Sequence, residues 1–231
     1  MAQFAVLHVS KGKSQSGGLT AHIERKVKPK NCNVKLTKEN IHKDYSHLGK
    51  TLGQRADQVI KNSGITRKVR TDAVKFNPII ISGSHDQMKK IQEEGNLDKW
   101  TEDAFKLVKE EFGEENIISF AMHADETTPH VHAVIVPIVP MEEAERVESE
   151  QGIKRKKKKK NPDKVRLSSK ILFRQENLVK LQDKVALKMM KWGFQRGIKG
   201  SRAKHEDLQV YYKRVSNPVA TELNVKAKTS Y

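Results

Sequence analysis

Four stretches of the chain are rich in apolar and β-branched residues and have the pattern of β-strands. They cover residues 4–9, 73–82, 117–124 and 130–138, and Gly83 follows the second as its expected end. Only residues 125–129 connect the last two stretches, so we expect these to form a β-hairpin. A further strand is expected over residues 165–173.

Apolar residues recur at helical spacing in two long segments, residues 96–112 and 174–192. Asn96 is the first residue of the first segment and is of a type that can cap a helix. Shorter helices are expected at residues 19–26, 48–62 and 203–214. Helices mixed in this non-alternating order with a hairpin indicate an α+β fold, in which helices flank an antiparallel sheet that carries the active site on its face.

Two segments fit neither pattern. Residues 31–46 are polar and read as irregular. Residues 141–163 change from an acidic cluster to a lysine run, which predicts a long surface excursion that stays mobile until a ligand binds.

Charge is distributed very unevenly along the 231 residues, whose formal net charge is +17. Residues 1–153 carry 22 basic and 22 acidic side chains, so residues 154–231 carry the whole excess. Such a basic segment favours a polyanion such as nucleic acid, although membrane surfaces and acidic proteins attract basic patches too. We expect DNA contacts from Lys26, Lys28, Lys30, Lys154, Arg155, Lys156, Lys157, Lys158, Lys159, Lys160 and Lys170.

The remaining composition indicates a cytoplasmic protein. A single cysteine, Cys32, excludes an internal disulfide framework and suits a reducing compartment. The apolar runs are too short to span a bilayer, and the first residues lack the order of a signal peptide, so no stable membrane insertion is expected.

The segment MHADETTPHVHAVIVP, residues 122–137, carries the candidate chemistry. His130 and His132 are two apart on an expected strand, so they project to one face, and the hairpin brings His123 beside them. Three imidazoles on one face are suited to a metal ion and leave coordination positions open. An ion there would polarise a phosphate as a Lewis acid. Asp125 and Glu126 lie in the connecting turn, where Asp125 is expected at least to shape the turn.

These motifs resemble a known family. The HVH strand is similar to the signature of HUH endonucleases, and H-x-D-E-x-T-P-H-x-H, from His123 to His132, closely resembles the metal motif of the Mob/Pre plasmid-mobilisation relaxases. The segments GGLTAHIER, LSSKILFRQENL and AKHEDLQ resemble further parts of that family. The resemblance reaches about residue 214, so we expect a nicking domain over residues 1–214 and a tail over residues 215–231.

The resemblance implies metal-dependent, strand-specific nicking and rejoining of DNA at a plasmid transfer origin, which initiates mobilisation. It also implies that His22 is the nucleophile and forms a phosphoramidate with the 5′-phosphate. Manganese or magnesium is the expected ion, with zinc or nickel as alternatives. The expected partners are the hairpin and single strand of the origin, with accessory mobilisation proteins or a coupling protein.

Two charged residues are expected to assist His22. Arg25 lies three residues later, hence on the same face of the expected helix, and its planar fork suits a phosphate oxygen. A surface salt bridge to Glu24 or another acid is the alternative. Glu126 is expected to orient His22, accept its proton or complete the metal shell.

Three other functions remain open. Most HUH enzymes attack DNA with tyrosine, so a rolling-circle replication initiator would use Tyr45 instead of His22. A non-catalytic, metal-stabilised DNA-binding module would bind DNA without nicking it. A zinc-dependent hydrolase of small substrates would leave the basic third of the chain unexplained.

Overall fold

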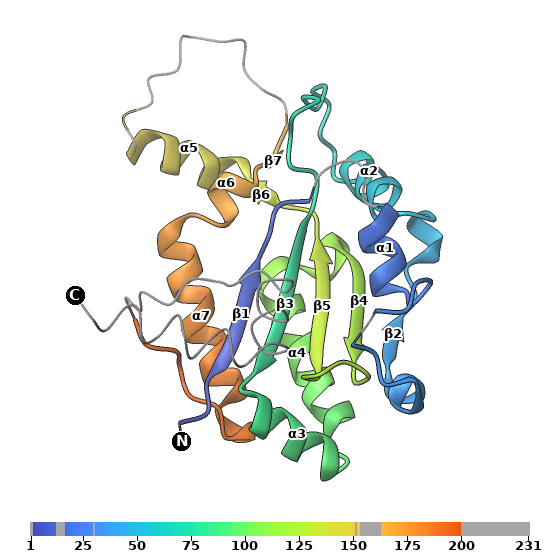
Figure 1. Ribbon diagram of the computed structural model, residues 1–231. Helices are drawn as coiled ribbons and strands as arrows, with labels where there is room; N and C mark the ends of the chain where they lie inside the picture. Colours follow the sequence, from blue (N-terminus) through green and yellow to red (C-terminus); the bar gives the residue numbers. More distant parts are fainter. Residues whose placement is uncertain (1, 13–16, 30, 151, 153–162, 200–231) are drawn as a thin grey trace, which may run out of the picture. The chain divides into compact units, whose positions relative to one another are not determined.

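The computed structural model describes residues 2–12, 17–29, 31–150, 152 and 163–199 (Figure 1). The chain divides into two compact units, Met1–Gly197 and Ile198–Tyr231, and nearly all described residues belong to the first. The expected helix at residues 203–214 lies outside the described residues. The domain limit at residue 214 therefore stays a prediction.

A five-stranded antiparallel sheet forms the centre of the first unit, with the strand order β1-β3-β5-β4-β2. Its strands are β1 (Ala5–Val9), β2 (Ile41–Lys43), β3 (Asn77–Gly83), β4 (Ile117–His123) and β5 (His130–Ile135). Two shorter strands, β6 (Ile138–Pro140) and β7 (Val165–Leu167), pair separately. The predicted hairpin is confirmed as β4–β5, and the predicted α+β class is correct.

Helices cover both faces of this sheet: α1 (Gly17–Ile23) and α2 (Leu52–Asn62) cover one, and α3 (His85–Glu93), α4 (Leu97–Phe112) and α7 (Gln175–Met189) the other. The helices α5 (Met141–Glu150) and α6 (Ser169–Leu172) pack on β6. Short 3-10 helices are η1 (Val34–Glu39), η2 (Ser46–Leu48), η3 (Glu114–Asn116) and η4 (Met190–Trp192).

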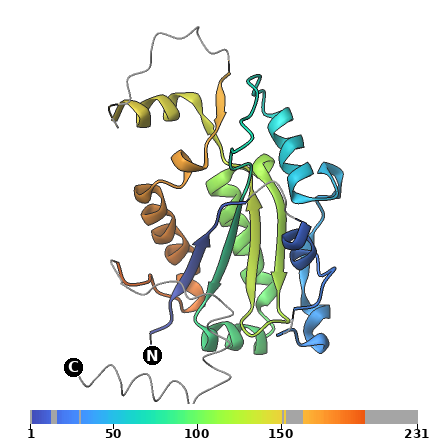
Figure 2. The same ribbon diagram turned by 45° about the horizontal axis from the view of Figure 1, so that its top comes forward.

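The two faces have separate cores. Residues of α3, α4 and α7 pack with Ile79, Phe120 and Val131 on one face, where Trp100 is fully buried. Residues of α1 and α2 pack with Ile118, Ala121 and Val134 on the other. Figures 1 and 2 show α4 behind the sheet, on the side away from α1 and α2.

Local chemistry moves several boundaries from the predicted ones. The helix expected at residues 48–62 begins at Leu52, because Thr51 and Gln54 form a capping box there. The helix expected at residues 19–26 is α1 and ends at Ile23, and Arg25 beyond it has a φ of +53°. Asn96 occupies the N-cap position of α4, but its side chain makes no capping hydrogen bond, so the predicted cap is wrong.

Three strand predictions also change. Residues 73–76 precede β3, and Phe76 forms only an isolated bridge with Gly12. The strand expected at residues 165–173 is β7 followed by α6, because the Ser168 side chain accepts a hydrogen bond from the backbone of Ile171 and caps a helix. Gly83 is the last residue of β3, where an added Cβ would lie 2.0 Å from the Phe194 ring.

The two segments read as irregular contain regular structure. Residues 31–46 include η1 and β2. The predicted excursion begins as helix α5, because Ala144 and Val147 are buried in a small core with Val139 and Ile171. Residues 153–162, which make up most of the excursion beyond α5, lie outside the described residues. No described helix is long and apolar enough to cross a membrane, and the cytoplasmic location stays a prediction.

Candidate metal and nucleophile site

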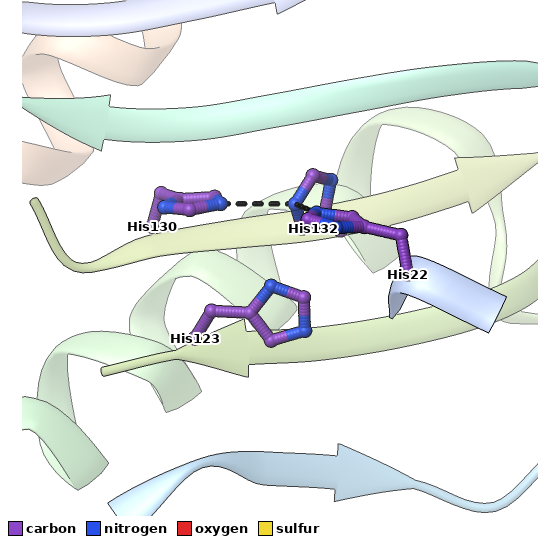
Figure 3. Close-up of side chains that lie close together, drawn as sticks. All are labelled: His22, His123, His130 and His132. Atoms are coloured by element: carbon purple, nitrogen blue, oxygen red, sulfur yellow. Dashed lines mark hydrogen bonds between the residues drawn. The ribbon is translucent and has the colours of Figure 1, made fainter. Parts of the chain in front are cut away.

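The β4–β5 hairpin gathers three histidines on the face of the sheet that α1 covers. His123 and His130 are partners in the strand register, and His132 follows His130 by two residues (Figure 3). The ring centroids of His130 and His132 are 4.7 Å apart, and those of His123 and His132 are 4.8 Å apart. The predicted convergence of these three side chains is present.

Backbone carbonyls fix two of these rings. His130 Nδ1 lies 2.9 Å from the Thr128 carbonyl oxygen, so it donates there and leaves Nε2 with a free lone pair. His123 Nε2 lies 3.0 Å from the Ile23 carbonyl oxygen and donates to it. His123 Nδ1 is then left buried without a hydrogen-bond partner among the described residues. An imidazole that donates one nitrogen to a carbonyl and directs the other inward is typical of a metal ligand.

His22 joins this group from the last turn of α1. Its Nε2 lies 3.4 Å from His132 Nε2. One ligand atom from each of His22, His123, His130 and His132 lies within 4.8 Å of all the others. Burial of Ile23 and a hydrogen bond of 3.3 Å from the Leu52 backbone to Thr20 Oγ1 hold α1 against the sheet and α2.

The donor set fits a divalent ion. Burial lowers the pKa of His22 and His130 and lowers the pKa of His132 well below its usual value, which keeps these rings neutral and able to donate a lone pair. His130 Nε2 and His132 Nε2 are 2.9 Å apart, within hydrogen-bond distance of each other. Imidazole ligands suit zinc, nickel and other first-row ions.

A buried ion-pair cluster of Arg25, Asp125 and Glu126, here called the brace, holds α1 against the hairpin. Arg25 donates from Nη2 to Asp125 at 2.6 Å and to Glu126 at 2.7 Å, and from Nε to Asp125 at 3.2 Å. Its Nη1 donates to the His22 carbonyl oxygen at 3.2 Å. Arg25 lies past the end of α1, so the predicted shared helical face with His22 is wrong, and its left-handed backbone turns it toward the carboxylates. Arg25 therefore forms a salt bridge, but with the hairpin acids and buried, not on the surface as the alternative had it.

Asp125 is the centre of this brace. Its side chain is fully buried and also accepts hydrogen bonds of 3.2 Å from Cys32 Sγ and from Thr37 Oγ1. Burial alone would raise the pKa of Asp125, but hydrogen bonds from Arg25, Asn40 and Cys32 outweigh it and lower the pKa to about 2. From the sequence, Asp125 could supply a carboxylate as ligand, orienter or base, or only shape the turn; its contacts with Arg25, Cys32 and Thr37 were not predicted. The polar composition of residues 31–46 could have indicated that this segment supplies hydrogen-bond donors to a buried group, since Cys32 in this segment donates to Asp125.

Glu126 connects the brace to the histidines. It accepts a hydrogen bond of 3.2 Å from Asn31 Nδ2, and its Oε1 lies 3.6 Å from both His22 Nε2 and His123 Nδ1. Burial raises the pKa of Glu126, but the neighbouring imidazoles, above all His123, and a hydrogen bond from Arg25 lower it by more, so the carboxylate is ionised. This position beside His22 suits orientation of the ring.

The predicted DNA contacts are only partly described. Lys26 is exposed and pairs with Glu24 at 2.6 Å, while Lys28 and Lys170 are exposed. The others lie outside the described residues: Lys30, Lys154, Arg155, Lys156, Lys157, Lys158, Lys159 and Lys160.

Tyr45, the alternative nucleophile, lies elsewhere. It stacks on His47 and packs against the α4-side core, and it lines a cavity of about 610 Å³ with Phe105 and Ile117. Burial raises its pKa to about 12, which disfavours the phenolate. Tyr45 therefore packs on the opposite face of the sheet from the histidine cluster.

Known proteins resemble this chain in sequence and in fold. The model of the family described as "Plasmid recombination enzyme" (Mob_Pre) matches residues 1–213. A plasmid recombination enzyme from Bacillus sp is 28% identical over 218 residues, which are 91% of this chain and 46% of that protein. A type 2 enzyme from Staphylococcus aureus gives the same identity and coverage. The chain therefore spans about half the length of these curated relatives.

A solved structure extends the likeness. The MobM relaxase domain (MOBV; Mob_Pre) bound to plasmid pMV158 oriT DNA, in a manganese-bound crystal at pH 5.5, matches with a TM-score of 0.70 and 28% identity. The match covers 91% of this chain and 98% of that one. The resemblance expected from the motifs is confirmed, and the chain belongs to the Mob/Pre family of plasmid recombination enzymes.

Proposed function

We propose that this chain nicks and rejoins one strand of DNA at a plasmid transfer origin through a covalent bond to His22. The observation that carries the proposal is the convergence of His22 from α1 with the three hairpin histidines. The names of the relatives, and the transfer-origin DNA and manganese in the similar relaxase domain, support the same reaction.

A divalent ion held by His123, His130 and His132 would polarise the scissile phosphate as a Lewis acid. His22 Nε2 then attacks phosphorus, the N–P bond forms, and the bond to the 3′-oxygen breaks. The imidazole gives up one proton and the leaving 3′-oxygen takes one, so the step balances without water. One phosphorus bond is exchanged for another, and the reverse step rejoins the strand.

The charged residues support this attack. Glu126 stands beside His22 Nε2 and orients the ring. Arg25 holds Glu126 and Asp125, which positions α1 and therefore His22. Direct contact of Arg25 with a phosphate oxygen stays a prediction, as do the lysine contacts with DNA and the accessory proteins.

Covalent adduct formation tests the proposal. The protein would be incubated with manganese and supercoiled plasmid carrying a candidate origin, alongside His22→Phe and Tyr45→Phe variants. We expect an acid-labile attachment to the DNA 5′ end with the wild type and Tyr45→Phe, and none with His22→Phe. An acid-stable adduct lost in Tyr45→Phe would favour the tyrosine initiator, and DNA binding without nicking would favour the non-catalytic module.

A further inference from the structure

The nucleophile lies inside the metal site and not beside it. His22 Nε2 is 3.4 Å from His132 Nε2, and all four ligand atoms lie within 4.8 Å of one another. A site that held the ion with three histidines alone would not require the fourth ring at this distance. The position of His22 therefore needs an explanation beyond attack on a phosphate.

Ligand geometry supplies one. An imidazole nitrogen binds zinc at about 2.0–2.1 Å, so the nitrogens of a tetrahedral site lie about 3.4 Å from each other. The distance between the His22 and His132 nitrogens is 3.4 Å, which is long for a hydrogen bond between them. The pair is thus spaced for a shared ion.

We propose that His22 is the fourth ligand of the ion before DNA binds, and that the scissile phosphate displaces it. This inference rests on the proposed function, in which His22 is the nucleophile. The Nε2 lone pair can bind the ion or attack phosphorus, but it cannot do both at once. Ligation therefore keeps the nucleophile latent, and the arrival of a phosphate oxygen on the ion releases it.

The four rings differ in how firmly they are held: His123 and His130 are each fixed by a backbone carbonyl and His132 is buried, whereas His22 has neither restraint among the described residues. The side chain of His22 is 33% exposed, whereas that of His123 is fully buried. Carbonyl oxygens of Ile23 and Thr128 hold His123 and His130 by their second nitrogens, while no described residue hydrogen-bonds to His22 Nδ1. A released His22 ring still has Glu126 as a neighbour, 3.6 Å from Nε2.

Cobalt(II) binding without DNA tests the inference, because its visible absorption distinguishes a four-coordinate from a six-coordinate ion. The wild type would be compared with His22→Phe and His22→Gln. His42→Phe is the matched control, since the exposed His42 ring lies 5.9 Å from that of His123 but outside the four-ligand group. We expect both His22 variants to bind cobalt at least about tenfold more weakly and to lose the four-coordinate spectrum, with His42→Phe unchanged.

An oligonucleotide with an uncleavable scissile linkage provides the second arm. With this oligonucleotide bound to each protein, the wild type should have the same spectrum as the His22 variants. The cobalt affinities of the wild type and the variants should then also be the same. Equal cobalt affinity and equal spectra of DNA-free wild type and His22→Phe would overturn the inference. If the wild type still formed the 5′ adduct with manganese, the proposed function would stand while the inference failed. If the four-coordinate spectrum depended on His22 but no adduct formed, His22 would be a metal ligand and the proposed function would fail.

Discussion

The two faces of strand β5 show how one sheet separates chemistry from stability. His130, His132 and Val134 face α1 and α2, whereas Val131, Ala133 and Ile135 face α4 and are fully buried. Because side chains alternate with a period of two, neighbours in sequence belong to different environments. A substitution on the α4 face should therefore change mainly the free energy of unfolding, whereas one of the histidines on the α1 face should change mainly the reaction. Val134, on the α1 face, is buried in the core of that face.

The largest effect is expected on the α4 face. Trp100 is fully buried in that core, and Trp100→Ala should lower the free energy of unfolding by about 3–5 kcal/mol. Urea denaturation would measure this loss. The amount of adduct per folded molecule should stay close to that of the wild type. If folded Trp100→Ala molecules formed less adduct, the α4 face would also contribute to the reaction, against this expectation.

His132→Ala on the α1 face should do the reverse. Loss of a ligand removes the ion's contribution of several kcal/mol, so the rate of adduct formation should fall by about 10²–10³-fold. Chelation of the metal from the wild type should give a similar loss, restored by adding manganese. Unfolding in the absence of metal should shift less than in Trp100→Ala, and a fully active His132→Ala protein would contradict the site.

Asp125→Asn tests the connection between the face and α1. The amide weakens the interaction with Arg25, so His22 is positioned less well, and we expect the rate constant of adduct formation on bound DNA to fall about 10–100-fold. DNA affinity should change little, which separates positioning from binding. Asp125→Glu keeps the charge and should recover part of the rate; equal loss in both variants would point to a packing role alone.

Tyr45→Phe is expected to have the smallest effect. Tyr45 packs beside the α4-side core and away from the histidines, so adduct formation should change less than about twofold. Single-turnover kinetics with saturating DNA would measure this. A large loss would assign Tyr45 a role that its position does not suggest.

Local periodicity explains what the sequence could predict. The hairpin, the shared face of His130 and His132 and the long helices follow from spacing within one element. The brace could not be predicted in this way, since Asp125 and its partner Cys32 are 93 residues apart. Strand β2 has only three residues, and η1 is short, so neither gives a periodic signal.

The helix α5 illustrates a different failure. Its sequence is highly charged and looks like exposed coil, yet Ala144 and Val147 are both buried against Val139 and Ile171. Two apolar residues on one side are enough when a partner surface exists, and that surface is visible only in three dimensions.

The hydrogen bond from His123 to the carbonyl oxygen of Ile23 limits how this protein can change over evolution. Every residue has a backbone carbonyl group, whatever its side chain. Residue 23 can therefore be exchanged for another apolar residue without losing the contact. Inserting one residue in α1 would rotate everything beyond it by about 100° and present a different carbonyl. In this part of the molecule, substitutions of apolar residues can therefore be tolerated during evolution, but insertions and deletions cannot.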